Sequence, residues 1–192
     1  LYIADKTQVF ADFATWWSDT STPRQMLMLF DINFGGGTPS NNYVFSMSAA
    51  VTGGSSGGYG LMATNGTNLI PKVNNAGTVT DISGVQAAAG STEYRFCLLW
   101  DAPGLLLHQY RNATGGTAKV LTALPSAISA AYGCSFMGRS TTTTPGNLFR
   151  ASDRMGNILM LKPRFDISGD MAAIAADFQK YPNKIGLIAR DL

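Results

Sequence analysis

The chain has 192 residues, of which 45% are hydrophobic and 14% are charged, and its formal net charge is +2. The charged share is low against about 25% in typical soluble domains, so Ser, Thr, Asn, Gln and Gly must cover most of the surface. The basic residues are scattered rather than clustered, which disfavours nucleic-acid binding. The longest run of large apolar residues, Met26 to Phe30, is far shorter than the ~20 residues that span a bilayer, so we expect no membrane insertion.

Short apolar or alternating segments recur along the chain, and turn-forming residues separate them. This spacing is typical of antiparallel sandwiches and barrels. Because all-β chains of this size normally form one unit, we expect a single domain over residues 1–192. The segments that predict strands are 8–17, 24–34, 42–51, 58–65, 77–84, two within 93–112, then 117–124, 132–140, 146–152 and 156–167.

The segment EYRFCLLWDAPGLLLHQYRN, residues 93–112, holds two apolar runs separated by Asp101-Ala102-Pro103-Gly104. Proline fixes its own φ and glycine supplies a positive φ, a combination that is typical of a chain reversal. The segment therefore predicts a β-hairpin.

One helix is predicted near the C-terminus, over residues 168–180. Met171, Ile174, Ala175 and Phe178 repeat there at the i, i+3, i+4, i+7 spacing of an amphipathic helix. We expect this helix to pack its apolar face across one mouth of the sandwich.

The two ends of this helix also carry recognisable signals. Ser168 or Asp170 can cap its start with a side-chain oxygen. Pro182 ends it, because proline cannot continue a helix. For residues 183–192 we expect either one more strand or a tail that docks elsewhere on the domain.

Three segments follow one another in an order that is found in a known superfamily. They are STEYRFCLLWDAPGLLLHQYRNATGG (91–116), CSFMGRS (134–140) and GNILMLKPRFDISGDMAAIAADFQKYP (156–182). In this layout the chain resembles the concanavalin A-like lectin/glucanase superfamily, in its laminin-G-like or pentraxin-like branch. The resemblance implies an all-β, antiparallel two-sheet jelly-roll sandwich with one short C-terminal helix. It also implies a fold that often binds carbohydrate and sometimes calcium.

Enzymes of this superfamily hydrolyse polysaccharides with two glutamates on one strand. This chain has a single glutamate, Glu93, and no two aspartates alternate along a predicted strand. The closest aspartates, Asp166 and Asp170, flank the predicted helix start, where capping explains them. Because a glycosidase needs a paired acid and nucleophile or base, we predict no catalytic residues and no enzyme activity.

His108 is the single histidine, so a Ser-His-Asp triad would have to use it. Strand alternation places His108 on the same face as Leu106 and Tyr110. We predict that it is a hydrogen-bonded histidine at the surface of a sheet.

Sugar sites combine an aromatic face for the apolar side of the ring with neutral donors and acceptors for the hydroxyl groups. For each aromatic residue taken singly, core packing is the alternative role. The residues that we predict to bind ligand are Trp17, Tyr59, Asn65, Trp100, Tyr110 and Arg139.

No cofactor or metal site is predicted. His108, Cys97 and Cys134 do not have the spacing of a zinc site. Calcium is the alternative, with Asp101 or Asp153 as ligands, although no loop is dense in Asp and Asn. We expect both cysteines to be buried thiols, with a disulfide as the alternative.

Low Lys and Glu contents together with loops rich in Ser, Thr, Gly and Asn resemble bacteriophage virion proteins, including tail-fibre, spike and capsid-decoration modules. We therefore predict a non-catalytic recognition domain that binds a surface glycan for host attachment. It would act as a homo-oligomer in a virion or another extracellular assembly. The alternatives are a structural virion protein without a glycan site, and an unconventional polysaccharide hydrolase.

Overall fold

A computed structural model describes the strands and helices of this chain. The described residues are 24–35, 42–48, 58–64, 68–75, 78–81, 86–87, 92–101, 106–115, 119–120, 134–136 and 152–187. The strand predicted at 8–17 lies outside them, and of the strand predicted at 146–152 only Ser152 is described, which is in a turn. Of those predicted at 117–124 and 132–140, residues 119–120 and 134–136 are described, and both are strands.

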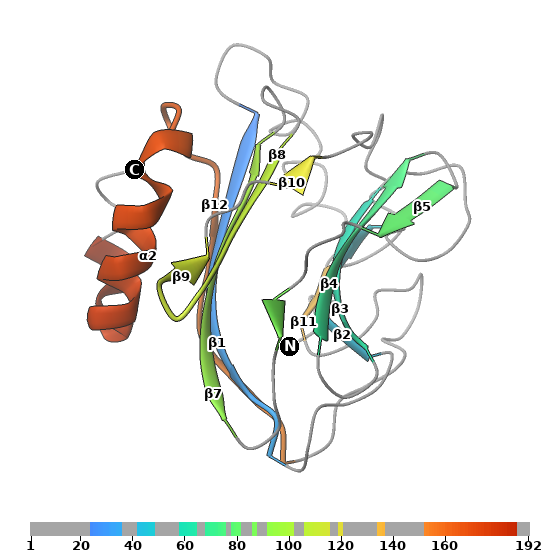
Figure 1. Cartoon of the computed structure of the whole chain (residues 1–192), viewed down its shortest axis with the longest axis horizontal. Coiled ribbons are helices and arrows are strands. Elements are labelled where there is room, and N and C mark those ends of the chain that lie inside the picture. The colour runs from blue at the N-terminus through green and yellow to red at the C-terminus, as the bar shows by residue number, and fades with distance from the viewer. Residues whose placement is uncertain are drawn as a thin grey trace.

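The strands form two sheets that face each other (Figure 1). The first sheet has the order β10 (Lys119–Val120), β8 (Leu106–Arg111), β7 (Glu93–Asp101), β1 (Gln25–Asn33) and β12 (Arg154–Leu161), with β9 (Thr114–Gly115) paired to β8. The second has the order β11 (Cys134–Phe136), β2 (Asn42–Ser48), β3 (Gly58–Thr64), β4 (Asn68–Asn75) and β5 (Thr78–Asp81), with β6 (Gln86–Ala87) paired to β4. Every strand pair in the described residues is antiparallel, which confirms the predicted all-β sandwich.

The hairpin predicted at 93–112 is formed by β7 and β8, which pair from Asp101–Leu106 to Phe96–Arg111. On its other side β7 pairs with the whole of β1, from Gln25–Asp101 to Asn33–Glu93. β7 and β1 are therefore central strands, and each row of paired residues across them forms one rung of the first sheet.

Both faces of β1 and β7 are buried over most of their length. On the face towards the second sheet, Phe30 stacks on its register partner Phe96 with ring centroids 5.3 Å apart. On the opposite face, Leu29 and Cys97 belong to a cluster that includes helix residues. Side chains alternate between the faces of a strand, so a strand that is covered on both faces needs apolar residues at consecutive positions. This explains the uninterrupted runs MLMLF and FCLLW.

Helix α2 (Met171–Lys180) packs on the outer face of the first sheet, away from the second sheet (Figure 1). Its buried residues are those predicted from their spacing, Met171, Ile174, Ala175 and Phe178. They pack against the strand residues Leu27, Leu29, Cys97 and Leu99. The expectation that the helix closes a mouth of the sandwich is therefore wrong. The apolar rungs on the outer face of the sheet need a cover, and the helix supplies it.

The start of α2 differs from the prediction. A 3₁₀ turn, η1 (Ser168–Asp170), precedes the helix, and neither Ser168 nor Asp170 forms a side-chain cap. Asp170 already has a helical backbone conformation (φ −97°, ψ −1°), which is not the extended geometry of a capping residue. Asp166 takes the capping role instead, because its Oδ1 accepts the Ser168 backbone N–H at 2.9 Å.

After α2 the chain stays helical instead of forming a strand. η2 spans Pro182–Lys184, and residues 185–187 are helical as well. The strand prediction is therefore wrong over 183–187. Ile185 packs against the cluster beneath α2, as expected for a docking segment. Residues 188–192 lie outside the described part of the chain.

The sequence pattern does not predict β4, because Pro71 lies at its centre and proline cannot donate to a sheet. β4 pairs with β3 along its whole length. On its other side, β5 pairs with residues 72–75 and β6 pairs with residues 68–69. Among the described residues, Ile70 and Pro71 therefore have no partner strand on that side, since β5 and β6 stop on either side of them. The missing N–H of Pro71 is tolerated there, although β4 has neighbouring strands on both sides.

Candidate functional site

Two predicted ligand-binding residues, Trp100 and Tyr110, lie on opposite faces of the first sheet. Trp100 is 0% exposed and pairs with Leu107, so its indole is part of the core and has no face open to a sugar ring. Tyr110 pairs with Cys97 and packs, partly buried, against the cluster beneath α2. The two rings therefore do not form one platform, and the binding role predicted for Trp100 is corrected to a core role.

The structure gives no side-chain position for the other predicted ligand-binding residues. Tyr59 lies on β3, opposite Met47 of β2 and Val73 of β4, and its side chain is not described. Residues Trp17, Asn65 and Arg139 lie outside the described part of the chain. Their binding roles remain predictions.

Cys97 is a free thiol buried beneath α2. Desolvation raises the pKa of this thiol well above its usual value, so it stays protonated and packs as a small apolar residue. Cys134 lies on β11 in the second sheet, opposite Met47. The structure confirms the expected buried thiol at Cys97.

A cluster of polar side chains lies on the outer face of the first sheet, near the start of α2. The Gln25 side-chain amide donates to Asp101 Oδ1 at 3.1 Å and to Asp166 Oδ1 at 2.7 Å, and Gln25 Oε1 accepts the Ile167 N–H at 3.2 Å. We call Gln25, Asp101 and Asp166 the amide clamp. His108 Nε2 lies 3.7 Å from Asp101 Oδ2, and both side chains are largely buried. The clamp ties the segment before α2 to the ends of β1 and β7.

The amide clamp brings together two carboxylates that the sequence alone does not pair. Both oxygens bond the same amide nitrogen, so the two carboxyl groups lie close together, as the carboxyl pair of a glycosidase does. A glycosidic bond would have to lie between them, and Gln25 Nε2 occupies that position. The Asp101 side chain is also only 7% exposed. The geometry is that of a structural bridge between a buried and an exposed carboxylate.

The hydrogen bonds of the clamp also act on Asp166. The Ser168 backbone N–H, the Gln25 amide and the Ser168 side chain all bond to its carboxylate and hold its pKa below the usual value. Hydrogen bonds to the charged form of a carboxyl group favour that form. Asp166 therefore contributes to folding as a carboxylate.

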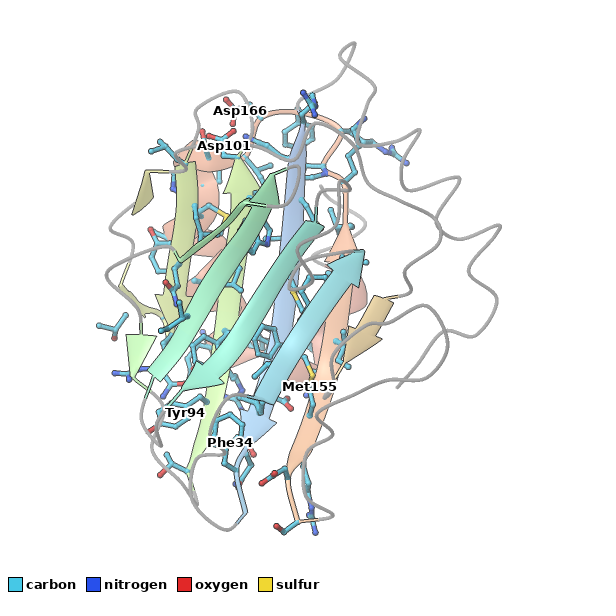
Figure 2. The ribbon with its side chains drawn as sticks, turned by 90° about the vertical axis from the view of Figure 1, so that its right-hand side faces the viewer. Phe34, Tyr94, Asp101, Met155 and Asp166 are labelled. Carbon is cyan, nitrogen blue, oxygen red and sulfur yellow. The ribbon has the colours of Figure 1, made fainter. Side chains whose placement is uncertain are left out.

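A hollow lies at the opposite end of the first sheet, where β1 ends and where β7 and β12 begin. Figure 2 shows Met155 near this end, with Phe34 and Tyr94, whereas Asp101 and Asp166 lie at the other end. The hollow has a volume of about 310 Å³. Its lining residues are Asp31, Asn33, Glu93, Arg154, Met155 and Gly156. We call it the end hollow. Apart from Met155 and Gly156, the described residues that line it have polar or charged side chains.

A bulge in β12 positions Asp31 in the end hollow. Leu29 pairs with Leu159 and Asp31 pairs with Gly156, so β12 has one residue more than β1 over this stretch. Asn157, in the bulge, has φ 44° and donates its side-chain amide to Asp31 Oδ2. Gly156 makes room for the carboxylate, because a Cβ there would lie 2.8 Å from Asp31 Oδ1.

The next residue across the sheet, Arg95, connects this region to the end of α2. Arg95 pairs with Asp31, donates from Nη1 to the Gln179 backbone oxygen at 2.9 Å, and forms an ion pair with Glu93 at 3.4 Å. Arg95 Nε and Gln179 Oε1 are buried without a hydrogen-bond partner. Arg95 therefore joins the strand positions beside the end hollow to the end of α2.

The sequence analysis does not select Asp31, Asn33 or Arg154, because they come from segments more than a hundred residues apart. A signal was nevertheless present in FDINF (30–34) and EYRF (93–96). Polar residues alternate there at strand ends, which indicates that one face is not covered.

Neither a metal cluster nor a membrane-spanning helix is found in the described stretches. No group of three or more His, Cys, Asp or Glu in them could hold a metal ion. Asp101, one of the two candidate calcium ligands, bonds to Gln25 instead. No helix among the same residues is long and apolar enough to cross a membrane.

Several solved structures have a similar fold. The CBM40 of Ruminococcus gnavus IT-sialidase, bound to α2,3 sialyllactose, has a TM-score of 0.58 and 11% identity, with 91% of each chain covered. The receptor-binding domain of botulinum neurotoxin mosaic serotype C/D has a TM-score of 0.53 and 10% identity, over 80% of this chain and 36% of that one. A SAP-like pentraxin from Limulus polyphemus has a TM-score of 0.52 and 12% identity, over 80% of this chain and 70% of that one.

These likenesses establish the fold of the chain as a lectin-like jelly-roll sandwich with a short C-terminal helix, as predicted. At such identities the likeness concerns the fold, and function has to be argued from the site. No protein-family model and no curated protein sequence matches the chain.

Proposed function

We propose that this chain is a non-catalytic carbohydrate-binding domain. The observation that carries the proposal is the end hollow, a polar site on a lectin-like sandwich. The similar CBM40 structure was solved with α2,3 sialyllactose bound, which adds support for a glycan as the class of ligand.

The residues of the end hollow suit the hydroxyl groups of a sugar. The carboxylate of Asp31 accepts hydrogen bonds, the guanidinium of Arg154 donates them, and the amide of Asn33 does both. A sugar hydroxyl both donates and accepts, so a mixed set of this kind can satisfy it on both counts. Asp31 is fixed by Asn157, so little side-chain entropy is lost when a ligand binds.

The absence of catalysis is part of the proposal. Glu93 is the single glutamate of the chain, and Arg95 forms an ion pair with it. Asp101 and Asp166 are close together, but Gln25 lies between them. Asp31 and Glu93 line the end hollow together, but Asn157 bonds to Asp31 and Arg95 pairs with Glu93. None of these arrangements supplies the free acid and nucleophile that glycoside hydrolysis needs.

We further propose that the domain works outside the cell, in host attachment by a virion or in another extracellular assembly. The low share of charged residues and the hydroxyl-rich sequence support this setting. A homo-oligomer would present several weak glycan sites at once, and avidity would then raise the apparent affinity by orders of magnitude.

Binding of the purified chain to an array of neutral and acidic glycans tests the proposal. We expect selective hits whose affinity falls at least about tenfold in Asp31→Asn. The matched control is Asp177→Asn, the same charge change on the exposed face of α2, which should bind like the parent. Trp17→Ala tests in the same assay whether the predicted aromatic contributes.

An inert array would contradict the proposal, and stable oligomers of that inert protein would favour the structural virion alternative. Release of reducing sugar from a bound polysaccharide would contradict the non-catalytic part and favour the hydrolase alternative.

A further inference from the structure

We infer that the glycan bound at the end hollow is an oligosaccharide, with at least two sugar units held in two adjoining subsites. This inference rests on the proposed function and adds to it the size of the ligand and the way in which the site is divided.

The geometry begins with a second hollow next to the end hollow. It has a volume of about 300 Å³ and is lined by Asn33, Gly35, Ser152 and Arg154. Asn33 and Arg154 line both hollows, so the two share a wall made of one amide and one guanidinium. Ligand pockets typically measure about 300–1,000 Å³, so each hollow suits one small unit and the two together suit a longer ligand.

The charges of the two hollows differ. The end hollow has the carboxylates of Asp31 and Glu93 in addition to Arg154. In the second hollow Arg154 is the single charged residue among the described lining residues. The first hollow is therefore rich in acceptors and the second in donors, so a sugar with an acidic group would be favoured in the second.

A close approach of two chain segments forms the second hollow. A Cβ at Gly35 would lie 2.3 Å from the Ser152 backbone oxygen, so only glycine fits where the end of β1 meets the segment before β12. Because Gly35 has no side chain and Ser152 has a small exposed one, the space beside Arg154 stays open. Asn33, Gly35, Ser152 and Arg154 thus form a surface that continues the end hollow, which a single sugar unit would leave unused.

A length series of the best glycan from the array, from monosaccharide to tetrasaccharide, tests this inference by calorimetry. We expect the affinity to rise at least tenfold from one unit to two and to change little beyond three. Ser152→Leu places a larger side chain in the second hollow and leaves the lining of the end hollow unchanged. This variant should abolish the gain in affinity from the second sugar unit, and its affinity for the monosaccharide should stay within twofold of that of the parent.

The matched control is Ala173→Leu, which adds an apolar side chain on the exposed face of α2. It should keep the full dependence on ligand length. A monosaccharide that binds as tightly as the longer ligands would overturn the inference and leave the proposed function intact. A rise in affinity from one sugar unit to two that persists in Ser152→Leu would also overturn the inference and leave the proposed function intact. If no glycan of any length binds, the proposed function fails, and the inference fails with it.

Discussion

At one end of the first sheet, Gln25, Asp101 and Asp166 bond to one another, whereas at the other end Asp31, Asn33 and Arg154 line a hollow. Gln25 lies at one end of β1 and Asp31 and Asn33 at the other, and the remaining residues of each set come from neighbouring strands or, for Asp166, from the segment before η1. Between the two ends, the rungs Leu27–Leu99 and Leu29–Cys97 are apolar and lie beneath α2. The polar residues at the two ends are thus arranged differently: those of the clamp bond to one another, and those at the other end line an open hollow.

The length of α2 accounts for this division. A helix of ten residues is about 15 Å long, and same-face residues on a strand are about 7 Å apart, so α2 covers two or three rungs. Rungs beyond its ends have no apolar cover and carry polar residues. Near its start one amide, that of Gln25, bridges two carboxylates, whereas beyond its end Asp31 and Glu93 have separate partners, Asn157 and Arg95.

The largest effect is expected at the amide clamp. Gln25→Ala removes the amide between the two carboxylates and leaves Asp101, which is 5% exposed, without that donor. We expect a loss of about 2–4 kcal/mol in the free energy of unfolding, measured by chemical denaturation. Gln179→Ala is the control, because its Oε1 has no hydrogen-bond partner, and it should cost less than about 0.5 kcal/mol. Equal losses in the two variants would mean that the clamp is not a stabilising bridge.

A smaller effect is expected at the end hollow. Gly156→Ala places a Cβ within 2.8 Å of Asp31 Oδ1 and forces the carboxylate to move. We expect a loss of about 1–2 kcal/mol in stability, since overpacking costs this much. Glycan affinity should fall about tenfold on the same array.

Gly169→Ala provides the comparison for that variant, because a Cβ at Gly169 meets nothing within 4 Å. It should change neither stability nor binding by a measurable amount. Tight binding that persists in Gly156→Ala would show that Asp31 does not contact the ligand.

The smallest effect is expected in the pH dependence of the free energy of unfolding. The pKa of Asp166 is lower in the folded state than in the unfolded state, where it is about 3.9. Its carboxylate therefore contributes to stability above the pKa of the unfolded state. This contribution is lost as the pH falls through the lower pKa of the folded state. The stability difference between the parent and Asp166→Asn should therefore be constant from pH 7 to about 5 and shrink below about 4. The effect is modest because Asp166 is exposed.

Denaturation curves at several pH values measure this difference. Asp170→Asn is the control, since its side chain forms no cap, and it should follow the parent at every pH. A difference that stays constant down to pH 2 would contradict the role of the charged Asp166.

Much of the fold follows from local patterns in the sequence. The turn residues 101–104 and the flanking apolar runs predict the β7–β8 hairpin, and the spacing of Met171, Ile174 and Phe178 predicts the buried face of α2. Each of these signals lies within one short segment. β4 is not predicted, because the tolerance for Pro71 depends on two separate neighbouring strands that stop on either side of it.

The candidate site could not be predicted in the same way. Asp31, Glu93 and Arg154 meet only because β1, β7 and β12 are neighbours, and that order is a property of the whole sheet. Aromatic residues suit sugars, so the sequence favours Trp100 as a ligand platform, but the structure buries it between the two sheets. The two-sided burial of a strand depends on which elements cover it, and these lie elsewhere in the chain.

The bulge at Asn157 has a consequence for how this protein can change over time. It alters the path of β12 only beyond Leu159, so the residues of the end hollow are separated from the packed rungs beneath α2. Substitutions on the hollow side, Gly156 excepted, can therefore accumulate without disturbing the packing beneath α2. A chain built in this way can change what the hollow accommodates while its packed core stays the same.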